Sequence, residues 1–214
     1  MKNQEVYQDK YFQNNFFVDL LIKNFFRSIE DIFETVKVKN VLETAAGYGF
    51  STEKISSFLG DADFQASELR RELVRESQKR NPLLKINQES LYDLKRKDNQ
   101  FDMVIALEVL EHLKKPELAL RELHRVTSCY CLLSVPNEPL WSFLNICRLK
   151  YLKNWGNTPD HCQKWSKKKF KKFLSPYFEI KMVKSPLPWI IILAKKKTDI
   201  LTNRDSFGNI KIVG

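Results

Sequence analysis

Val41-Leu42-Glu43-Thr44, followed by Ala45-Ala46-Gly47-Tyr48-Gly49, is the stretch that decides the fold. The first four residues form a short, mostly apolar run that is typical of a buried strand, and a glycine-rich turn follows directly. After the turn, apolar residues between positions 55 and 59 recur at helical spacing until Gly60 ends the pattern. The stretch therefore predicts a strand, a tight turn and a helix.

The same alternation of strand and helix continues along the chain. Further strands are expected at 63–67, 83–86, 101–107 and 129–135, and helices at 69–80 and from Pro116 onward. Strands separated by helices predict an α/β fold, a Rossmann-like and mostly parallel sheet with helices on both faces. Two β-rich runs at 178–183 and 189–194 predict an antiparallel edge hairpin, preceded by a helix that Ser166 caps.

Composition excludes several classes of protein. The 15 Phe, 7 Tyr and 4 Trp among 214 residues give too much ring surface for a disordered chain. The longest strongly apolar run, 189–194, is far shorter than the ~20 residues that span a membrane. The first residues resemble no signal peptide, so we expect a cytoplasmic protein. Free thiols are expected in preference to a zinc site, because no C-x-x-C pair occurs among Cys129, Cys131, Cys147 and Cys162.

The net charge of +10 belongs to the C-terminal third of the chain. Residues 1–140 hold 20 basic and 22 acidic residues, whereas residues 141–214 hold 16 and 4. The densest group consists of Lys164, Lys167, Lys168, Lys169, Lys171 and Lys172. A solvated helix face is the favoured interpretation, since no RNA-binding module accompanies these lysines. Nucleic acid, an anionic membrane surface and an acidic substrate remain alternatives.

The glycine-rich turn has the features of a ligand site. Glycine lets a ligand approach the backbone closely, and a carboxylate about 20 residues further on, here Glu68, can accept both hydroxyls of a ribose. Thr52 stands where a dinucleotide fingerprint has its third glycine. Glu43 would repel a phosphate but would attract an ammonium group. A nucleoside with an amino-acid tail therefore fits better than a dinucleotide.

Four motifs follow one another in a characteristic order: residues 41–49, Glu68, Asp98 to Val104, and Leu107 to Leu113. This order resembles that of class I S-adenosylmethionine-dependent methyltransferases, in particular the type 11 branch, over roughly residues 38–138. Because the sequence has no internal repeat, low-complexity tract or Gly/Ser linker, we expect one domain over 1–214. Its parts are a helical cap (1–37), a cofactor-binding core (38–138), an inserted lid (139–165), a C-terminal helix with edge hairpin (166–197) and a tail (198–214).

The resemblance also implies roles for individual residues. Glu43 and the turn residues would hold the methionine part of the cofactor, Glu68 the ribose, and Leu107 would lie beside the sulfonium. The full set of cofactor-binding residues is Glu43, Ala45, Gly47, Tyr48, Gly49, Glu68, Leu69, Ser90, Leu91 and Leu107. Two positions depart from the family pattern: Ala45 replaces a glycine, and Ser90 replaces an acidic residue that commonly contacts the adenine amine.

Glu108, Glu111 and His112 have the spacing of one helical face just after the fourth strand. The resemblance to quinone-biosynthesis O-methyltransferases implies that such a group could bind a divalent cation, although a helix start without metal is the favoured interpretation. His112 is also the candidate general base, because the unperturbed pKa of histidine lies near neutrality.

Tyr7, Tyr11, His161 and Trp165 are candidates for contact with the methyl acceptor, with packing as the alternative for the aromatic residues. The predicted function is transfer of a methyl group from S-adenosylmethionine, leaving S-adenosylhomocysteine, to a small or lipid-like acceptor. An RNA or protein methyltransferase that docks through the basic C-terminal third is one alternative. A non-catalytic binding protein on the same fold is the other. Oligomeric state is left open.

Overall fold

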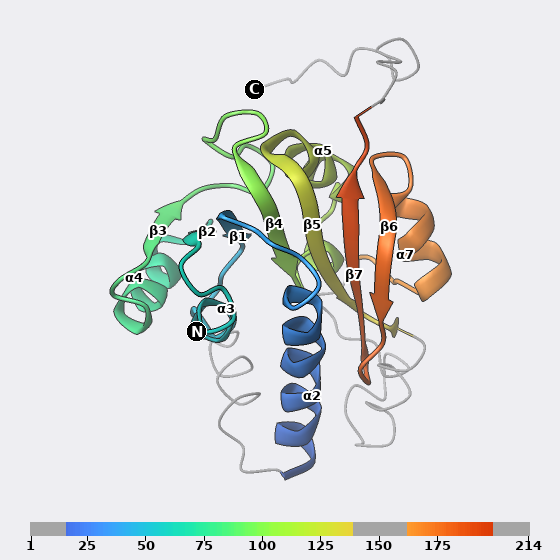
Figure 1. The fold of residues 1–214 in the computed structure, drawn as a ribbon, viewed down its shortest axis with the longest axis horizontal. Helices are drawn as coiled ribbons and strands as arrows, with labels where there is room; N and C mark the ends of the chain where they lie inside the picture. Colours follow the sequence, from blue (N-terminus) through green and yellow to red (C-terminus); the bar gives the residue numbers. More distant parts are fainter. Residues whose placement is uncertain (1–15, 139–161, 199–214) are drawn as a thin grey trace.

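The computed structural model describes residues 16–138 and 162–198, which contain a seven-stranded sheet in the order β3-β2-β1-β4-β5-β7-β6 (Figure 1). The first five strands of this order pair in parallel, whereas β7 pairs antiparallel with both β5 and β6. The strands are β1 (Asn40–Thr44), β2 (Asp63–Glu68), β3 (Lys85–Gln88), β4 (Phe101–Leu107), β5 (Thr127–Pro136), β6 (Phe178–Lys184) and β7 (Trp189–Lys196). This confirms the predicted α/β fold with a mostly parallel sheet and an antiparallel edge pair.

Helices cover both faces of the sheet (Figure 1). They are α2 (Phe16–Phe33), α3 (Phe50–Ser56), α4 (Arg71–Arg80), α5 (Pro116–Val126) and α7 (Lys167–Leu174), with a short 3-10 turn η1 (Leu110–His112) after β4. On one face, Ile29 of α2 lies in a core with Met103 and Ile105 of β4. On the other face, residues of α5 and α7 pack with Val104 and Ala106 of β4. Both faces of β4 are therefore buried, as its nearly continuous apolar sequence requires.

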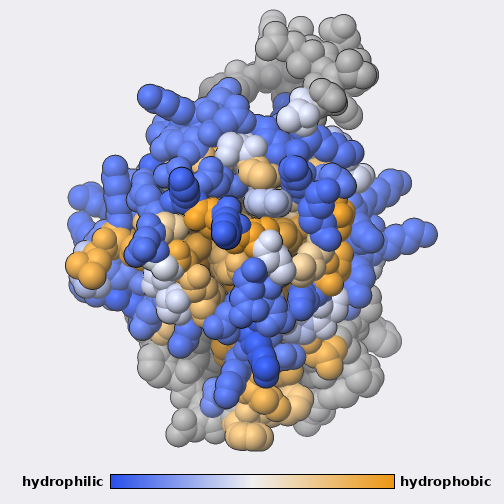
Figure 2. Space-filling view, in the orientation of Figure 1, coloured by the Kyte–Doolittle hydropathy of each residue, from blue (hydrophilic) through white to orange (hydrophobic). Residues whose placement is uncertain are grey.

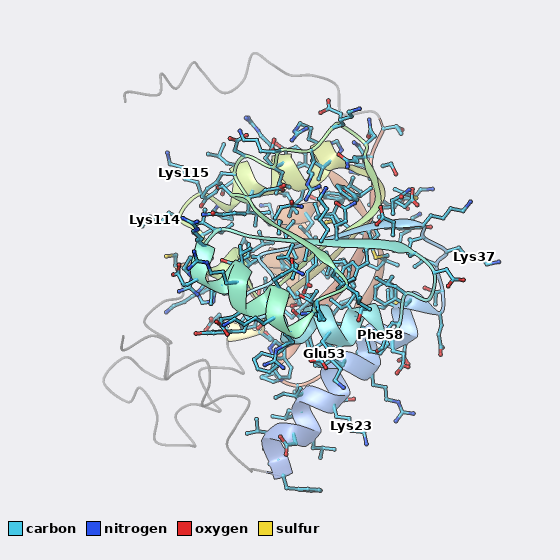
Figure 3. The ribbon with its side chains drawn as sticks, turned by 90° about the vertical axis from the view of Figure 1, so that its left-hand side faces the viewer. Lys23, Lys37, Glu53, Phe58, Lys114 and Lys115 are labelled. Carbon is cyan, nitrogen blue, oxygen red and sulfur yellow. The ribbon has the colours of Figure 1, made fainter. Side chains whose placement is uncertain are left out.

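The cap helix α2 packs against the segment that directly follows the first crossover helix α3. The Phe33 and Phe58 rings lie 6.3 Å apart between centroids, and Figure 3 shows Phe58 and Glu53 on the side of the molecule where α2 runs. Within the region expected to be a helical cap (1–37), the structure has a helix at 16–33, and the residues before it lie outside the described range. No helix among residues 16–138 and 162–198 is long and apolar enough to cross a membrane.

The C-terminal helix begins as the sequence predicts. The Ser166 hydroxyl accepts a hydrogen bond from the Lys169 backbone N–H at 3.3 Å, a standard N-cap. Phe170 and Leu174 are buried, while the five lysines of the helix are exposed. Hydrophilic residues cover most of the face shown in Figure 2. Apolar residues appear at its lower end, and the first turns of α2 carry the exposed Phe16, Phe17 and Leu20.

The structure adds detail on the cysteines and on the hairpin. Cys129, Cys131 and Cys162 are free thiols as expected, but only Cys131 is fully buried, and its burial raises the pKa of its thiol. The hairpin does not simply extend the sheet in chain order: β7 lies next to β5, and β6 forms the edge.

The strand order determines where a ligand can bind. The chain passes from β1 outward to β2 and β3, then crosses back to β4 on the other side of β1. In such sheets the crevice lies beyond the carboxyl ends of the strands on either side of this reversal. Thr44, Glu68 and Leu107 end β1, β2 and β4, so the predicted site residues meet at one edge of the sheet.

Candidate functional site

The turn after β1 contains three left-handed residues in alternation. Ala45, Gly47 and Gly49 have φ angles of 56°, 57° and 78°. The turn is closed by a 2.9 Å hydrogen bond from the Gly49 N–H to the Ala46 carbonyl, and α3 begins directly after Gly49. A Cβ on Gly47 would meet nothing within 4 Å, so space beside the backbone is open there. The glycine-rich sequence therefore forms a tight backbone loop with room against it.

The Glu68 carboxylate lies against this turn. One oxygen accepts a 2.9 Å hydrogen bond from the Gly47 N–H, and the other accepts a 3.0 Å bond from the Arg70 N–H. Glu68 is 7% exposed, yet each carboxylate oxygen can accept more than one hydrogen bond. The carboxylate is thus fixed in orientation and still has acceptor capacity for two hydroxyl groups.

Glu43 is a buried carboxylate at the base of the turn. Its Oε1 accepts a 2.6 Å hydrogen bond from the Ser51 hydroxyl, while its Oε2 is buried and has no hydrogen-bond partner. Burial raises the pKa of Glu43 from 4.5 to about 7, although the nearby hydroxyls of Ser51 and Thr52 oppose the shift. An unpaired buried carboxylate oxygen costs free energy unless a cation or donor approaches it. Glu43 therefore has the properties expected of a residue that receives an ammonium group.

Ala45 carries the strain that the sequence departure implied. A left-handed φ costs an L-residue about 1 to 2 kcal/mol, and glycine avoids that cost. Glycine also increases the entropy of the unfolded chain, which offsets part of the relieved strain. Ala45→Gly should therefore raise the free energy of unfolding by a net amount of about 0.5 to 1 kcal/mol. Urea denaturation measures this. The matched control is Ala46→Gly, at a buried neighbour without a positive φ, which should lower the free energy of unfolding. If Ala45→Gly also lowered the free energy of unfolding, Ala45 would not be strained.

The loop expected to contact the base lies between β3 and β4. Leu91 is buried, and the Ser90 hydroxyl accepts a 3.2 Å bond from the Tyr92 N–H; Leu69, directly after β2, is exposed. The Ser90 oxygen keeps one acceptor position and its own proton. This leaves it able to accept from an amine but without the charge of the usual acidic residue.

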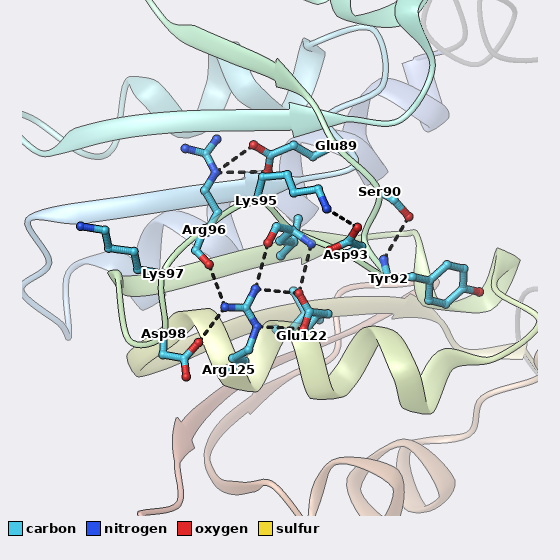
Figure 4. Close-up of polar contacts among 12 residues, drawn as sticks. Glu89, Ser90, Tyr92, Asp93, Lys95, Arg96, Lys97, Asp98, Glu122 and Arg125 are labelled. Atoms are coloured by element: carbon cyan, nitrogen blue, oxygen red, sulfur yellow. Dashed lines mark hydrogen bonds and ion pairs between the residues drawn. The ribbon is translucent and has the colours of Figure 1, made fainter. Parts of the chain in front are cut away.

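A network of charged residues holds this loop in place, as Figure 4 shows. The Arg96 Nε donates to one Glu89 oxygen at 3.1 Å and forms an ion pair with the other at 3.0 Å, with both side chains more than nine-tenths buried. Arg125 of α5 donates to the carbonyls of Leu94 and Arg96 at 2.9 and 2.7 Å and pairs with Asp98. These anchors were not predictable from the sequence, because their partners come from separate elements.

The end of β4 carries a second strained residue. Glu108 has a φ of 54°, and its N–H donates to the Ser134 hydroxyl at 3.1 Å. The same hydroxyl donates to a Glu108 carboxylate oxygen at 2.8 Å. Leu107, half-buried, pairs with Ser134 in the β4–β5 register. Ser134 thus fixes the chain where the sulfonium is expected to lie.

The predicted common helical face of Glu108, Glu111 and His112 is wrong. Only residues 110–112 form a helical turn, of 3-10 type, and the left-handed Glu108 lies before it. Glu111 is buried, and the His112 Nε2 lies 3.8 Å from its carboxylate. Within the described ranges, no three His, Cys, Asp or Glu side chains gather into a group that could hold a metal ion. The role of His112 as general base stays a prediction.

The expected acceptor contacts are mostly beyond the described part of the chain, where Tyr7, Tyr11 and His161 lie. Trp165 is described and is buried in the core, with ring centroids 5.5 and 4.8 Å from those of Phe170 and Phe173. Its carbonyl accepts a 2.9 Å bond from the Glu138 N–H. This geometry favours the packing alternative for Trp165.

Comparisons with known proteins bear on this arrangement. A family model described as a methyltransferase domain, of type 11, matches residues 42–129. This segment begins in β1 and ends in β5, so it contains the turn, Glu68 and the end of β4. No curated protein sequence matches the chain.

Solved structures, several of them of methyltransferases, share the fold at low sequence identity. Magnesium protoporphyrin IX methyltransferase of Synechocystis PCC 6803, solved with bound S-adenosylhomocysteine, superposes with a TM-score of 0.66 and 16% identity over 92% of this chain and 95% of that one. The PH0226 protein of Pyrococcus horikoshii OT3 superposes with a TM-score of 0.64 and 16% identity over 86% of this chain and 93% of that one. A methyltransferase of Haloferax volcanii, in complex with the activator Trm112, superposes with a TM-score of 0.61 and 12% identity over 74% of this chain and 82% of that one.

The family match and the structural likeness fall on the same part of the chain, the sheet and its crossover helices. The mostly parallel sheet with its antiparallel edge pair superposes on these structures over most of the chain. The chain therefore has the fold of these methyltransferase structures, and its residues 42–129 match the type 11 methyltransferase domain.

Proposed function

We propose that this protein transfers the methyl group of S-adenosylmethionine to a small-molecule or lipid-like acceptor. The observation that carries the proposal is the Glu68 carboxylate, which is fixed by two backbone N–H groups beside the open turn at Gly47. One of the related structures holds S-adenosylhomocysteine, the product of such a transfer. The proposed domain division keeps residues 38–138 as the cofactor-binding core.

The described residues fit this cofactor. Glu68 can accept the two ribose hydroxyls, Leu69 and Leu91 offer apolar surface to the base, and Ser90 offers an acceptor. The unpaired Oε2 of Glu43 suits an ammonium group. A dinucleotide is disfavoured, because the same buried carboxylate would face its phosphates.

The protein has little covalent chemistry to perform. S-adenosylmethionine, when bound, supplies a methyl group that its sulfonium makes electrophilic. The chain's contribution is to align donor and acceptor in a near-attack geometry and to exclude water. The strained link between Glu108 and Ser134 stands where such alignment is needed, at the end of β4. His112 would take a proton from an acceptor hydroxyl.

Glu68→Ala should weaken binding of S-adenosylhomocysteine by about 1.5 to 3 kcal/mol, a factor of roughly 10 to 150, because hydrogen bonds to a charged group are lost. Isothermal titration calorimetry measures the affinity. Asp63→Ala, an exposed carboxylate at the other end of β2, is the control and should bind as the wild type does. Equal affinity of Glu68→Ala and wild type would refute the assignment of Glu68 to the ribose.

A second candidate function is methylation of RNA or protein. The observation in its favour is α7, whose five exposed lysines make no ion pair with any residue in the described ranges. Polymer docking on such a face would make binding fall steeply with salt. Filter binding to a short RNA between 50 and 200 mM salt is the test on the RNA side. Because we favour a small acceptor, we expect weak binding that Lys168→Glu and Lys172→Glu do not change.

A binding protein without catalysis is the remaining alternative, which the strained Ala45 and the uncharged Ser90 support. The absence of heat on titration with S-adenosylmethionine and S-adenosylhomocysteine at high micromolar concentration would favour it. We expect instead that both ligands bind and that the wild-type protein releases S-adenosylhomocysteine when the right acceptor is supplied.

A further inference from the structure

The turn after β1 is held from behind by α4, through a residue that would not contact the cofactor. The Asn81 side chain at the end of α4 donates one Nδ2 proton to the Gly49 carbonyl at 3.0 Å and one to the Ser77 carbonyl at 3.1 Å. Both protons of the amide are thereby used. Asn81 is 6% exposed and lies 32 residues from Gly49 in the sequence.

The Gly49 carbonyl receives two hydrogen bonds from two different elements. The Glu53 N–H donates to it at 3.1 Å, as the first bond of α3, and Asn81 donates from α4. A carbonyl oxygen has two lone pairs, so both bonds can form together. The orientation of the last peptide group of the turn is thus fixed by α3 and α4 jointly.

The contact is close enough to require glycine. A Cβ on Gly49 would collide with the Ser77 hydroxyl and would stand 2.5 Å from Asn81 Nδ2 and 3.0 Å from the Ser77 Cα. The other side of the turn is held by β2, where the Ala46 N–H donates to the Ser67 carbonyl at 3.0 Å and Gly47 binds Glu68. The turn is therefore held between two supports, and Asn81 is the only side chain among the described residues that hydrogen-bonds it from the α4 side.

From this geometry we infer that Asn81 is a positioning residue for the cofactor: it preorganises the turn that would hold the amino-acid half of S-adenosylmethionine. This inference rests on the proposed function. A turn that is ordered before binding spares the ligand the free energy of ordering it. Loss of the Asn81 amide should therefore weaken ligands that lie along the turn more than ligands that use only the ribose and base contacts.

The test compares two ligands on the full chain by calorimetry. S-adenosylhomocysteine has an amino-acid half, whereas 5′-deoxy-5′-methylthioadenosine keeps the adenosine and the sulfur but lacks that half. In Asn81→Ala, the affinity for S-adenosylhomocysteine should fall about fivefold relative to the affinity for methylthioadenosine, at a temperature where the variant is fully folded. An unchanged ratio of the two affinities would overturn the inference.

Gln78→Ala provides the matched control. The Gln78 amide also ties the end of α4, by bonds to the carbonyls of Asn81 and Leu84 at 3.1 and 2.8 Å, but does not contact the turn. It should lower the melting temperature and leave the ratio of affinities unchanged. A ratio shifted equally by both variants would make Asn81 a purely structural residue.

If Asn81→Ala does not fold, Asn81→Asp serves instead, since it keeps the shape of the side chain but lacks the donors. It should shift the ratio in the same direction, and an unshifted ratio in this variant would likewise overturn the inference. Failure of the wild type to bind either ligand would reject the proposed function itself. Normal binding by the wild type with an unchanged ratio in the variants would reject only the role of Asn81.

Discussion

Replacing Gly49 with alanine should lower the free energy of unfolding by about 3 kcal/mol. About 1 to 2 kcal/mol of this comes from the φ of 78°, which an L-residue adopts only with strain. A further contribution of about 1 to 3 kcal/mol arises because the new methyl group overlaps Ser77 and Asn81, which have little room to move in a packed region. Urea denaturation with a two-state fit measures the change.

Gly47→Ala separates these two contributions. Gly47 has a similar backbone, with φ of 57°, but a Cβ there would meet nothing within 4 Å. Gly47→Ala should lower the free energy of unfolding only by the backbone strain, about 1 to 2 kcal/mol. Equal losses in the two variants would show that α4 does not press on the turn as the geometry indicates.

The second large effect concerns pH. The pKa of Glu43 is about 7 in the folded protein because the carboxylate is buried, and 4.5 is its ordinary value. Between these two values the folded state keeps a proton that the unfolded chain has lost. This group therefore lowers the stability as the pH rises from about 4.5 to about 7, by about 3 kcal/mol in total, and adds no further loss above that.

Glu43→Gln should remove this loss. The variant should match the wild type at pH 4.5 or be slightly less stable, and should exceed it by up to about 3 kcal/mol at pH 8, because glutamine carries no charge to bury. Denaturation of both proteins at a series of pH values gives the difference directly, since other titrating groups cancel. A difference that does not change between pH 4.5 and 8 would show that Glu43 ionises in the folded state as it does in water.

If Glu43→Gln stabilises the protein, the glutamate at this position lowers stability and its presence needs another reason. A buried carboxylate that destabilises the protein is retained where it serves a function, and a cationic ligand beside its unpaired oxygen would offset the cost. Stability and ligand binding should therefore change in opposite directions in this variant.

The fold was predictable from sequence because its signals are local. Apolar runs, Pro116 at a helix start and Ser166 at an N-cap each report on neighbouring residues, and the strand predicted at 101–107 has the observed bounds. Glu68 was also predictable, because its distance from the turn follows from the length of one crossover.

The supports of the site were not predictable from sequence. The sequence around Asn81 indicates only the end of a helix before a proline. The neighbouring residues give no sign of the hydrogen bond from Asn81 to Gly49. Ser134 and Glu108 meet only because β4 and β5 pair in one particular register. The helical spacing of Glu108, Glu111 and His112 misled for a related reason: the left-handed conformation of Glu108 places it outside the turn that follows.

The most direct test is a crystal structure of the protein grown with S-adenosylhomocysteine. The account predicts both ribose hydroxyls within hydrogen-bond distance of the Glu68 carboxylate, with the amino-acid half of the ligand along residues 45–49 and its ammonium group near Glu43. A ligand bound elsewhere, or a Glu68 side chain turned away from the sugar while the turn stays closed by other side chains, would contradict it.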